Sequence, residues 1–332
     1  MIVGIIAVVG AVIKSQGGFL AALDGLARVS DPAVSDTPGV FASFFGPDPV
    51  GLLGVVLLTS LGTWGLPQMV QKFYAIRSEK AIDKGTIIST VFAAIVAGGC
   101  YFLGGFGRLF SDQVDVAANG YDSIVPTMLE GLSTVLIAVV VILVLSASMS
   151  TLSSLVLASS STLTLDFIKD TIVKDMDEKR QILTMRLLIV VFIAISVVLA
   201  IVQYRSNVTF IAQLMGVSWG ALAGAFLAPF LYGLYWKKTT RGACWVSFLF
   251  STVVMLANIF FGKYFPTLLQ SPINAGAFCM LAGLIIVPVV SLVTPRLPQG
   301  QIDRIFACYD RKVVVSVKDS IGDHTNPKEE TP

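Results

Sequence analysis

The sequence predicts an all-α integral membrane protein, and its composition and its long apolar segments are the observations behind this prediction. Of the 332 residues, 55% are hydrophobic and only 13% are charged, whereas soluble domains carry about 25% charged residues. The mean hydropathy is +0.81. Such a composition disfavours a soluble enzyme, a disordered protein and a nucleic-acid binder. The net charge of +2 is too small to indicate a polyanionic partner.

Eight apolar segments follow one another along the chain, at residues 1–13, 50–70, 85–106, 134–157, 182–202, 210–236, 243–261 and 275–293. A helix needs about 20 mostly apolar residues to cross the hydrocarbon core of a membrane, and the segments after the first meet or approach that length. The first is too short to cross by itself, and it has neither the basic start nor the cleavage site of a signal peptide. We therefore expect the chain to enter this helix part-way along.

The connecting segments predict how the helices are oriented. Residues 14–49 are rich in Gly, Ser, Asp and Pro and favour a loop, in which Phe41, Phe44 and Phe45 suit a short interfacial helix. Basic residues gather after the second, fourth, sixth and eighth helices, which is the cytoplasmic side by the positive-inside rule. These positions hold 18 of the 23 basic residues, namely Lys72, Arg77, Lys80, Lys84, Lys169, Lys174, Lys179, Arg180, Arg186, Lys237, Lys238, Arg241, Arg296, Arg304, Arg311, Lys312, Lys318 and Lys328.

Two regions are therefore expected, a transmembrane transporter region over residues 1–295 and a cytoplasmic C-terminal tail over residues 296–332. His324, the single histidine, lies in the polar tail. The four cysteines are too widely spaced to indicate a disulfide framework or a zinc site. With no catalytic constellation in either region, the sequence predicts neither an enzyme nor an organic cofactor.

Polar side chains within the membrane-spanning segments are the functional candidates, because burying them without partners is costly. The densest group lies late in segment 134–157, where Ala147, Ser150 and Thr151 stand at i, i+3 and i+4 and share a helix face. Two hydroxyls, with the Ala147 carbonyl if it is freed from the helix, offer neutral oxygens to a small cation such as Na⁺. The alternative is that the hydroxyls bond to carbonyls one turn earlier and allow close helix packing.

Segment 50–70 carries a second candidate, because Gly62, Gly65 and Pro67 weaken the helix where it lies at membrane depth. Transporters place substrate at breaks of this kind, and a broken helix is tolerated in a membrane only where it lines a cavity or is buried in protein. The alternative is an ordinary proline kink.

Three stretches together resemble the sodium:solute symporter family, which includes sodium-coupled proline, pantothenate and sugar transporters. The first is GTWGLPQ at residues 62–68, followed by Lys72 and Phe73. The second is MSTLSS at residues 149–154, followed by SSS at residues 159–161 and Asp166. The third is LYWKKTTRGA at residues 234–243. Their order and separation agree with the family over nearly the whole chain, to about residue 295.

The resemblance implies a LeuT-like inverted-repeat transporter fold, in which two five-helix repeats enclose a central site. The eight helices resemble the last eight of a longer transporter, with the N-terminal repeat largely missing. Residue by residue, it implies Na⁺ binding by Ala147, Ser150 and Thr151, and substrate contact by Thr59, Thr63, Trp64 and Pro67. Thr59 and Thr63 stand where the proline-carrier pattern has a Trp and a Tyr, so another amino acid or a carboxylic acid is as well supported as proline.

The function implied is sodium-coupled symport of a small organic solute, carried out by a multi-pass protein of the cell membrane. Its partners are Na⁺ as the coupling ion, the solute and the lipid bilayer, without nucleic acid. We expect this chain to be the C-terminal part of a longer transporter and to be inactive alone. The alternative is a membrane-embedded solute sensor or regulatory protein with the same fold, but a tail of this length is shorter than a typical signalling domain.

Overall fold

The computed structural model describes residues 2–32, 34–73, 76, 79–114, 120–174, 176–206 and 211–310. These ranges are helical apart from turns and an isolated backbone bridge between Asp31 and Ser35. Six of their helices are long and apolar enough to cross a membrane, and a bent pair provides a seventh candidate span. The prediction of an all-α integral membrane protein is confirmed.

Each of the eight predicted apolar segments corresponds to one helix or to a broken pair of helices. The α-helices are α1 (Ile2–Ser15), α2 (Phe19–Arg28), α3 (Pro49–Gly65), α4 (Pro67–Phe73), α5 (Glu79–Gly105), α7 (Ile124–Glu130), α8 (Thr134–Thr162), α9 (Glu178–Ser206), α10 (Ile211–Tyr235), α11 (Arg241–Phe261), α12 (Thr267–Gln270), α13 (Pro272–Val293) and α14 (Gln299–Phe306). Short 3₁₀ turns lie at Val40–Ala42 and Phe106–Gln113. A π-helical turn at Leu163–Ile172 continues α8.

The expectation of a loop throughout residues 14–49 is wrong, because α2 lies within it. Gly17 and Gly18 adopt φ angles of +81° and +109°, which glycine tolerates, and they turn the chain by 64° between α1 and α2. The α2 helix buries Ala22 and Leu26 in a hydrophobic core. The helix is only 10 residues long and carries Asp24 and Arg28 on its exposed face, and the segment around it is rich in Gly, Ser, Asp and Pro, so its overall composition resembled that of a loop. The three phenylalanines near residue 41 lie at and after a single 3₁₀ turn.

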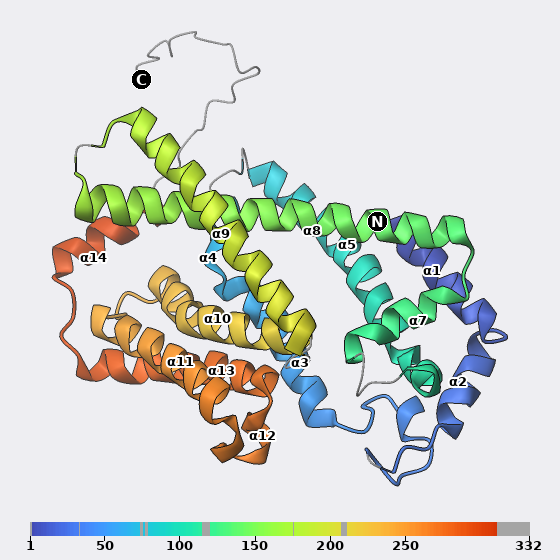
Figure 1. The fold of residues 1–332 in the computed structure, drawn as a ribbon. Coiled ribbons are helices and arrows are strands. Elements are labelled where there is room, and N and C mark those ends of the chain that lie inside the picture. The colour runs from blue at the N-terminus through green and yellow to red at the C-terminus, as the bar shows by residue number, and fades with distance from the viewer. Residues whose placement is uncertain are drawn as a thin grey trace.

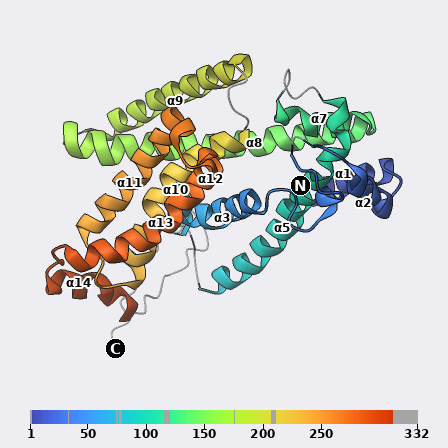
Figure 2. The same ribbon diagram turned by 90° about the horizontal axis from the view of Figure 1, so that it is seen from below.

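The helices form two groups, which are separate in both views of the molecule (Figure 1 and Figure 2). One group contains α1, α2, α5 and α7, whose shared core includes Val12, Leu26, Leu103 and Met128. The other contains α3, α10, α11 and α13, in which α10 packs against each of the other three. The long α8 extends across both groups and packs on α9 and α1. Most side chains of α8 and α9 are exposed.

Glycines bring the backbones of the second group into direct contact. A Cβ atom added to Gly220 of α10 would lie 2.6 Å from the Cα atom of Gly276 in α13. One added to Gly65 of α3 would lie 2.8 Å from the Cα atom of Ala223 in α10. Both distances are well inside van der Waals contact, so no side chain fits at either glycine. Small residues at interfaces allow such close approach between membrane helices.

We predict that Gly220→Ala destabilises the protein, because its methyl group has to push α10 away from α13. Overpacking of this kind costs about 1–3 kcal/mol, and the expected result is a lower midpoint of thermal unfolding for the detergent-solubilised protein. Gly233→Ala is the matched control, since it lies on the same helix with no atom within 4 Å of an added Cβ. Equal midpoints for the two variants would contradict the packing described above.

Candidate functional site

The second apolar segment is a broken helix. Helix α3 ends at Gly65, Leu66 has the extended angles φ −82° and ψ 118°, and α4 begins at Pro67. The proline explains the extended residue, because its ring disfavours helical angles at the residue before it. The carbonyl of Leu66 accepts a hydrogen bond from the backbone N–H of Met69 at 2.9 Å. Of the two readings that the sequence allowed, the structure has a break rather than a kink.

The break is anchored against α10 rather than exposed. The side chain of Leu66 is 1% exposed and packs in a core with Leu58, Leu227 and Met280. Gly65 lies against the backbone of Ala223. The interruption in α3–α4 is thus buried in protein on one side, as an interrupted helix within a membrane requires.

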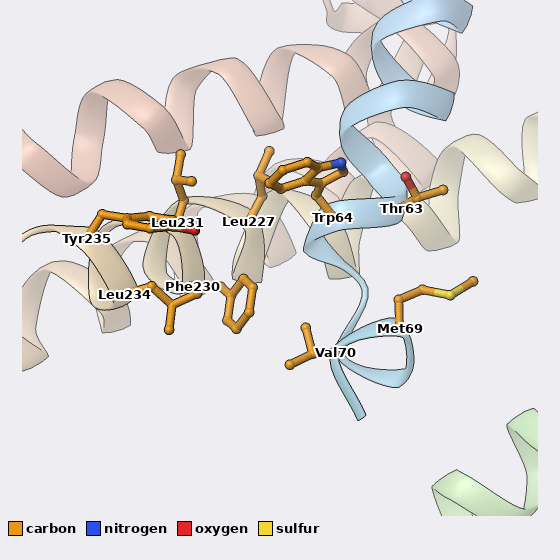
Figure 3. A pocket seen from close by; sticks show the side chains of 9 residues that line it. All are labelled: Thr63, Trp64, Met69, Val70, Leu227, Phe230, Leu231, Leu234 and Tyr235. Atoms are coloured by element: carbon orange, nitrogen blue, oxygen red, sulfur yellow. The ribbon is translucent and has the colours of Figure 1, made fainter. Parts of the chain in front are cut away.

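Next to this core the break borders a cavity of about 550 Å³ (Figure 3). Both helices flanking the break and the C-terminal half of α10 contribute to it. Its walls are Thr63, Trp64, Met69, Val70, Leu227, Phe230, Leu231, Leu234 and Tyr235. Trp64 is 63% exposed. A largely apolar cavity of this size with few polar groups is typical of a small-molecule site.

Two of the four residues that the sequence predicts to contact substrate line this cavity, Thr63 and Trp64. Thr59 lies one turn earlier on α3, and its hydroxyl donates to the carbonyl of Val55 at 2.8 Å. The hydroxyl of Thr63 donates to the carbonyl of Ser60 at 3.0 Å. Pro67 begins α4 and is exposed, and its ring is not part of the cavity wall.

The wall contributed by α10 is absent from the sequence-based prediction. Leu227, Phe230, Leu231, Leu234 and Tyr235 belong to a continuous apolar segment. In a membrane span, apolar residues that line a cavity have the same composition as residues that face lipid. Only the packing of α10 against α3 identifies them.

The predicted sodium-binding residues lie on α8 and meet at one oxygen atom. The hydroxyls of Ser150 and Thr151 both donate to the carbonyl of Ala147, each at 2.9 Å. Ser150 and Thr151 are exposed, while Ala147 is half-buried. The helix continues without interruption from Thr134 to Thr162, so no local distortion frees the carbonyl. Neighbouring Ser153 donates in the same way, to the carbonyl of Met149.

The two candidate sites belong to different parts of the fold. The break packs on α10 and α13, whereas α8 packs on α9 and α1. Among the described residues, no group of three or more His, Cys, Asp or Glu side chains that could hold a metal ion is found. The α8 helix contains no Asp or Glu, so the oxygens that it offers to a cation are neutral.

Comparison with known proteins identifies the family. The pattern of the sodium:solute symporter family matches residues 1–250, which is most of the chain. The chain belongs to this family. The resemblance noted from the sequence is therefore confirmed, and the broken α3–α4 segment and the hydroxyl-rich α8 face both lie within the matched range.

Three relatives within the sodium:solute symporter family are bacterial proline transporters. The sodium/proline symporter of Staphylococcus aureus is 25% identical over 254 residues, or 75% of this chain and 48% of its own length. The high-affinity proline transporter PutP of Bacillus subtilis is 25% identical over 67% of this chain and 46% of its own length. The osmoregulated proline transporter OpuE of the same species is 25% identical over 78% and 51%. The chain spans about half the length of these relatives.

The cavity predicts a pattern of thiol accessibility for a member of this family. The background is a variant in which the four native cysteines are replaced, namely Cys100, Cys244, Cys279 and Cys308. In this background we expect Thr63→Cys to react with a charged methanethiosulfonate reagent in proteoliposomes, because Thr63 lines the cavity. Leu58→Cys on the same helix should not react, because Leu58 is fully buried. Mass spectrometry of the labelled protein measures both. Failure of Thr63→Cys to react would mean that the cavity holds lipid rather than water.

Proposed function

We propose that this chain forms part of a sodium-coupled symporter that moves a small organic solute, such as an amino acid or a carboxylic acid, across the cell membrane. The family and its relatives are transporters rather than enzymes. The observation that carries the proposal is the break at Leu66, which is buried against α10 and borders a cavity that α3, α4 and α10 line together. The relatives' names support Na⁺ as the coupling ion. The basic side, with the C-terminus, would face the cytoplasm.

The solute would bind in the cavity beside the break, in contact with Thr63 and Trp64. Thr59 and Pro67 would act at its edge, Thr59 through its position one turn before Thr63 and Pro67 by keeping Leu66 extended. The apolar wall of α10 suits the carbon skeleton of a small amino or carboxylic acid. The charged groups of such a solute need polar partners at the break itself, where helix ends leave backbone N–H and C=O groups without intrahelical bonds.

Na⁺ would bind at the face of α8 formed by Ala147, Ser150 and Thr151. A hydroxyl has one proton and two lone pairs, so both side chains are able to donate to the Ala147 carbonyl and still present oxygen lone pairs to the ion. The Ala147 carbonyl already accepts both hydroxyls and the helical N–H four residues later. Direct contact between this carbonyl and Na⁺ would require a hydroxyl to release it.

Binding of Na⁺ would drive transport only if it favoured one conformation over another. The hydroxyl face of α8 and the break at α3–α4 lie on elements that pack in different groups. Movement of the α3–α10–α11–α13 group relative to α8 would change the spacing of the two sites. In this scheme Na⁺ stabilises the outward-open state, the solute enters the cavity, and both are released inside.

Thr151→Ala tests the sodium assignment in a longer, transport-active protein that contains this sequence. Thr151→Ala removes one oxygen from the ion, and the loss of one polar partner costs about 1–3 kcal/mol. The Na⁺ concentration that gives half-maximal uptake should therefore rise roughly tenfold. Thr151→Ser should restore the wild-type value because it restores the hydroxyl. Ser153→Ala is the control, since Ser153 bonds to a different carbonyl on the same helix. Unchanged sodium dependence in Thr151→Ala would refute the assignment.

We expect the 332-residue chain by itself not to transport. Ser150 and Thr151 are exposed, and three oxygens leave a Na⁺ shell incomplete by about two. Proteoliposomes that contain the chain alone should therefore show no uptake of labelled proline or of labelled carboxylic acids when a sodium gradient is imposed. Gradient-dependent accumulation of either solute would overturn this expectation and show that the chain completes the site.

A further inference from the structure

A second, shallower groove lies on the surface between α10 and α11, away from the break. It has a volume of about 290 Å³. Phe226 of α10 and Phe248 of α11 meet edge to face with ring centroids 5.7 Å apart, and Trp245 packs on Phe248 at 5.8 Å. The full lining is Ala225, Phe226, Pro229, Arg241, Cys244, Trp245 and Phe248. The groove is therefore apolar and aromatic, with one charged residue.

That charged residue, Arg241, stands at the first position of α11, where the chain enters the membrane after the short turn from α10. Phe248 lies seven residues further along the helix, which is about 10 Å at 1.5 Å per residue. The groove therefore has a cationic end at the level of the membrane surface and an aromatic end within the hydrocarbon layer. A phospholipid has the same polarity, with phosphate at the surface and acyl chains below it.

The surroundings of Arg241 leave its charge available. The residue is exposed, and within the described part of the chain no carboxylate lies within ion-pair distance of it. Lys238, in the same turn, is also exposed. Lys237 is engaged differently, with its ammonium group over the ring of Phe306 at 5.5 Å. A guanidinium binds phosphate through paired hydrogen bonds, and the charge of Arg241 itself disfavours a headgroup that carries its own ammonium.

The size of the groove, together with its cationic and aromatic ends, favours a lipid over a protein helix. A helix is about 10 Å across with its side chains, so a segment as long as the groove would fill about 800 Å³. The volume of about 290 Å³ is too small for it but accommodates part of an acyl chain. We propose that the groove between α10 and α11 binds an anionic phospholipid, with its phosphate on Arg241 and an acyl chain along Trp245, Phe248 and Phe226.

This site depends on the membrane location of α10 and α11 and is independent of the transport proposal. Residues 234–243 form one of the stretches that resemble the family, but neither candidate transport site uses Arg241. A bound lipid would fill the groove and hold the turn between the two helices at the membrane surface. The position of the cytoplasmic end of α10 would then depend on the amount of anionic lipid in the leaflet.

Fluorescence quenching tests the site directly, because Trp245 lines the groove. The protein is the 332-residue chain with Trp64, Trp219 and Trp236 replaced by Phe, in vesicles of phosphatidylcholine that contain a small fraction of phosphatidylglycerol. Bromine on the acyl chains of the phosphatidylglycerol should quench Trp245 more than the same fraction of brominated phosphatidylcholine does. We expect the affinity for the anionic lipid to be about fivefold higher than for phosphatidylcholine, because one basic residue near an anionic surface contributes about 1 kcal/mol.

Arg241→Gln should abolish this preference. Lys238→Gln is the control, because it removes one positive charge from the same turn without changing the groove, and it should largely retain the preference. Equal loss in both variants would indicate diffuse attraction to the anionic leaflet and would overturn the site. Absence of quenching by either brominated lipid would mean that lipid does not enter the groove, and it would overturn the site as well. Native mass spectrometry of the chain with its tryptophans intact checks the result: phosphatidylglycerol adducts should decrease in Arg241→Gln and persist in Lys238→Gln.

Discussion

Direct backbone contact between α3 and α10 holds the broken helix in place and shapes the cavity beside it. A broken helix leaves backbone polar groups without helical partners, and lipid cannot satisfy them. Here the break is covered because Gly65 lies directly against Ala223 and Leu66 is buried. The α10 helix is in turn held close to α13, where Gly220 meets Gly276. Loss of either contact would expose the break and widen the cavity beside it.

The same contact decides where chemistry takes place. Because α10 is fixed against the end of α3 at Ala223, the same face of α10 continues through Leu227 and Leu234 and forms the wall of the cavity next to Thr63 and Trp64. On α8, by contrast, the oxygens are arranged by local bonding alone, since two hydroxyls converge on one carbonyl within a regular helix. One candidate site is thus a product of packing between helices, and the other is a product of spacing within a helix.

Much of this was predictable from the sequence, for reasons that particular residues illustrate. Ser150 and Thr151 share a face with Ala147 because of helical periodicity, which no tertiary contact changes. Pro67 forces Leu66 out of the helical region wherever the segment lies. The helix α2 was not predictable in the same way: Gly17 and Gly18 suggest a turn, but only the burial of Ala22 and Leu26 shows that a packed helix follows them. The α10 wall gave no signal, because apolar residues facing a cavity and facing lipid are alike in composition.

The sequence by itself determined the class of protein, the positions of the helices, the point at which the second one breaks and the hydroxyl face of α8. These depend on composition, on periodicity and on the local geometry of proline, all of which act over a few residues. Only the tertiary structure decided that the break is buried against α10, which residues complete the cavity, and that Arg241 stands at the end of an aromatic groove. Each of these depends on how closely two helices that are far apart in the sequence approach each other in space. Glycines allow that approach, and the sequence does not show which residues they pack against.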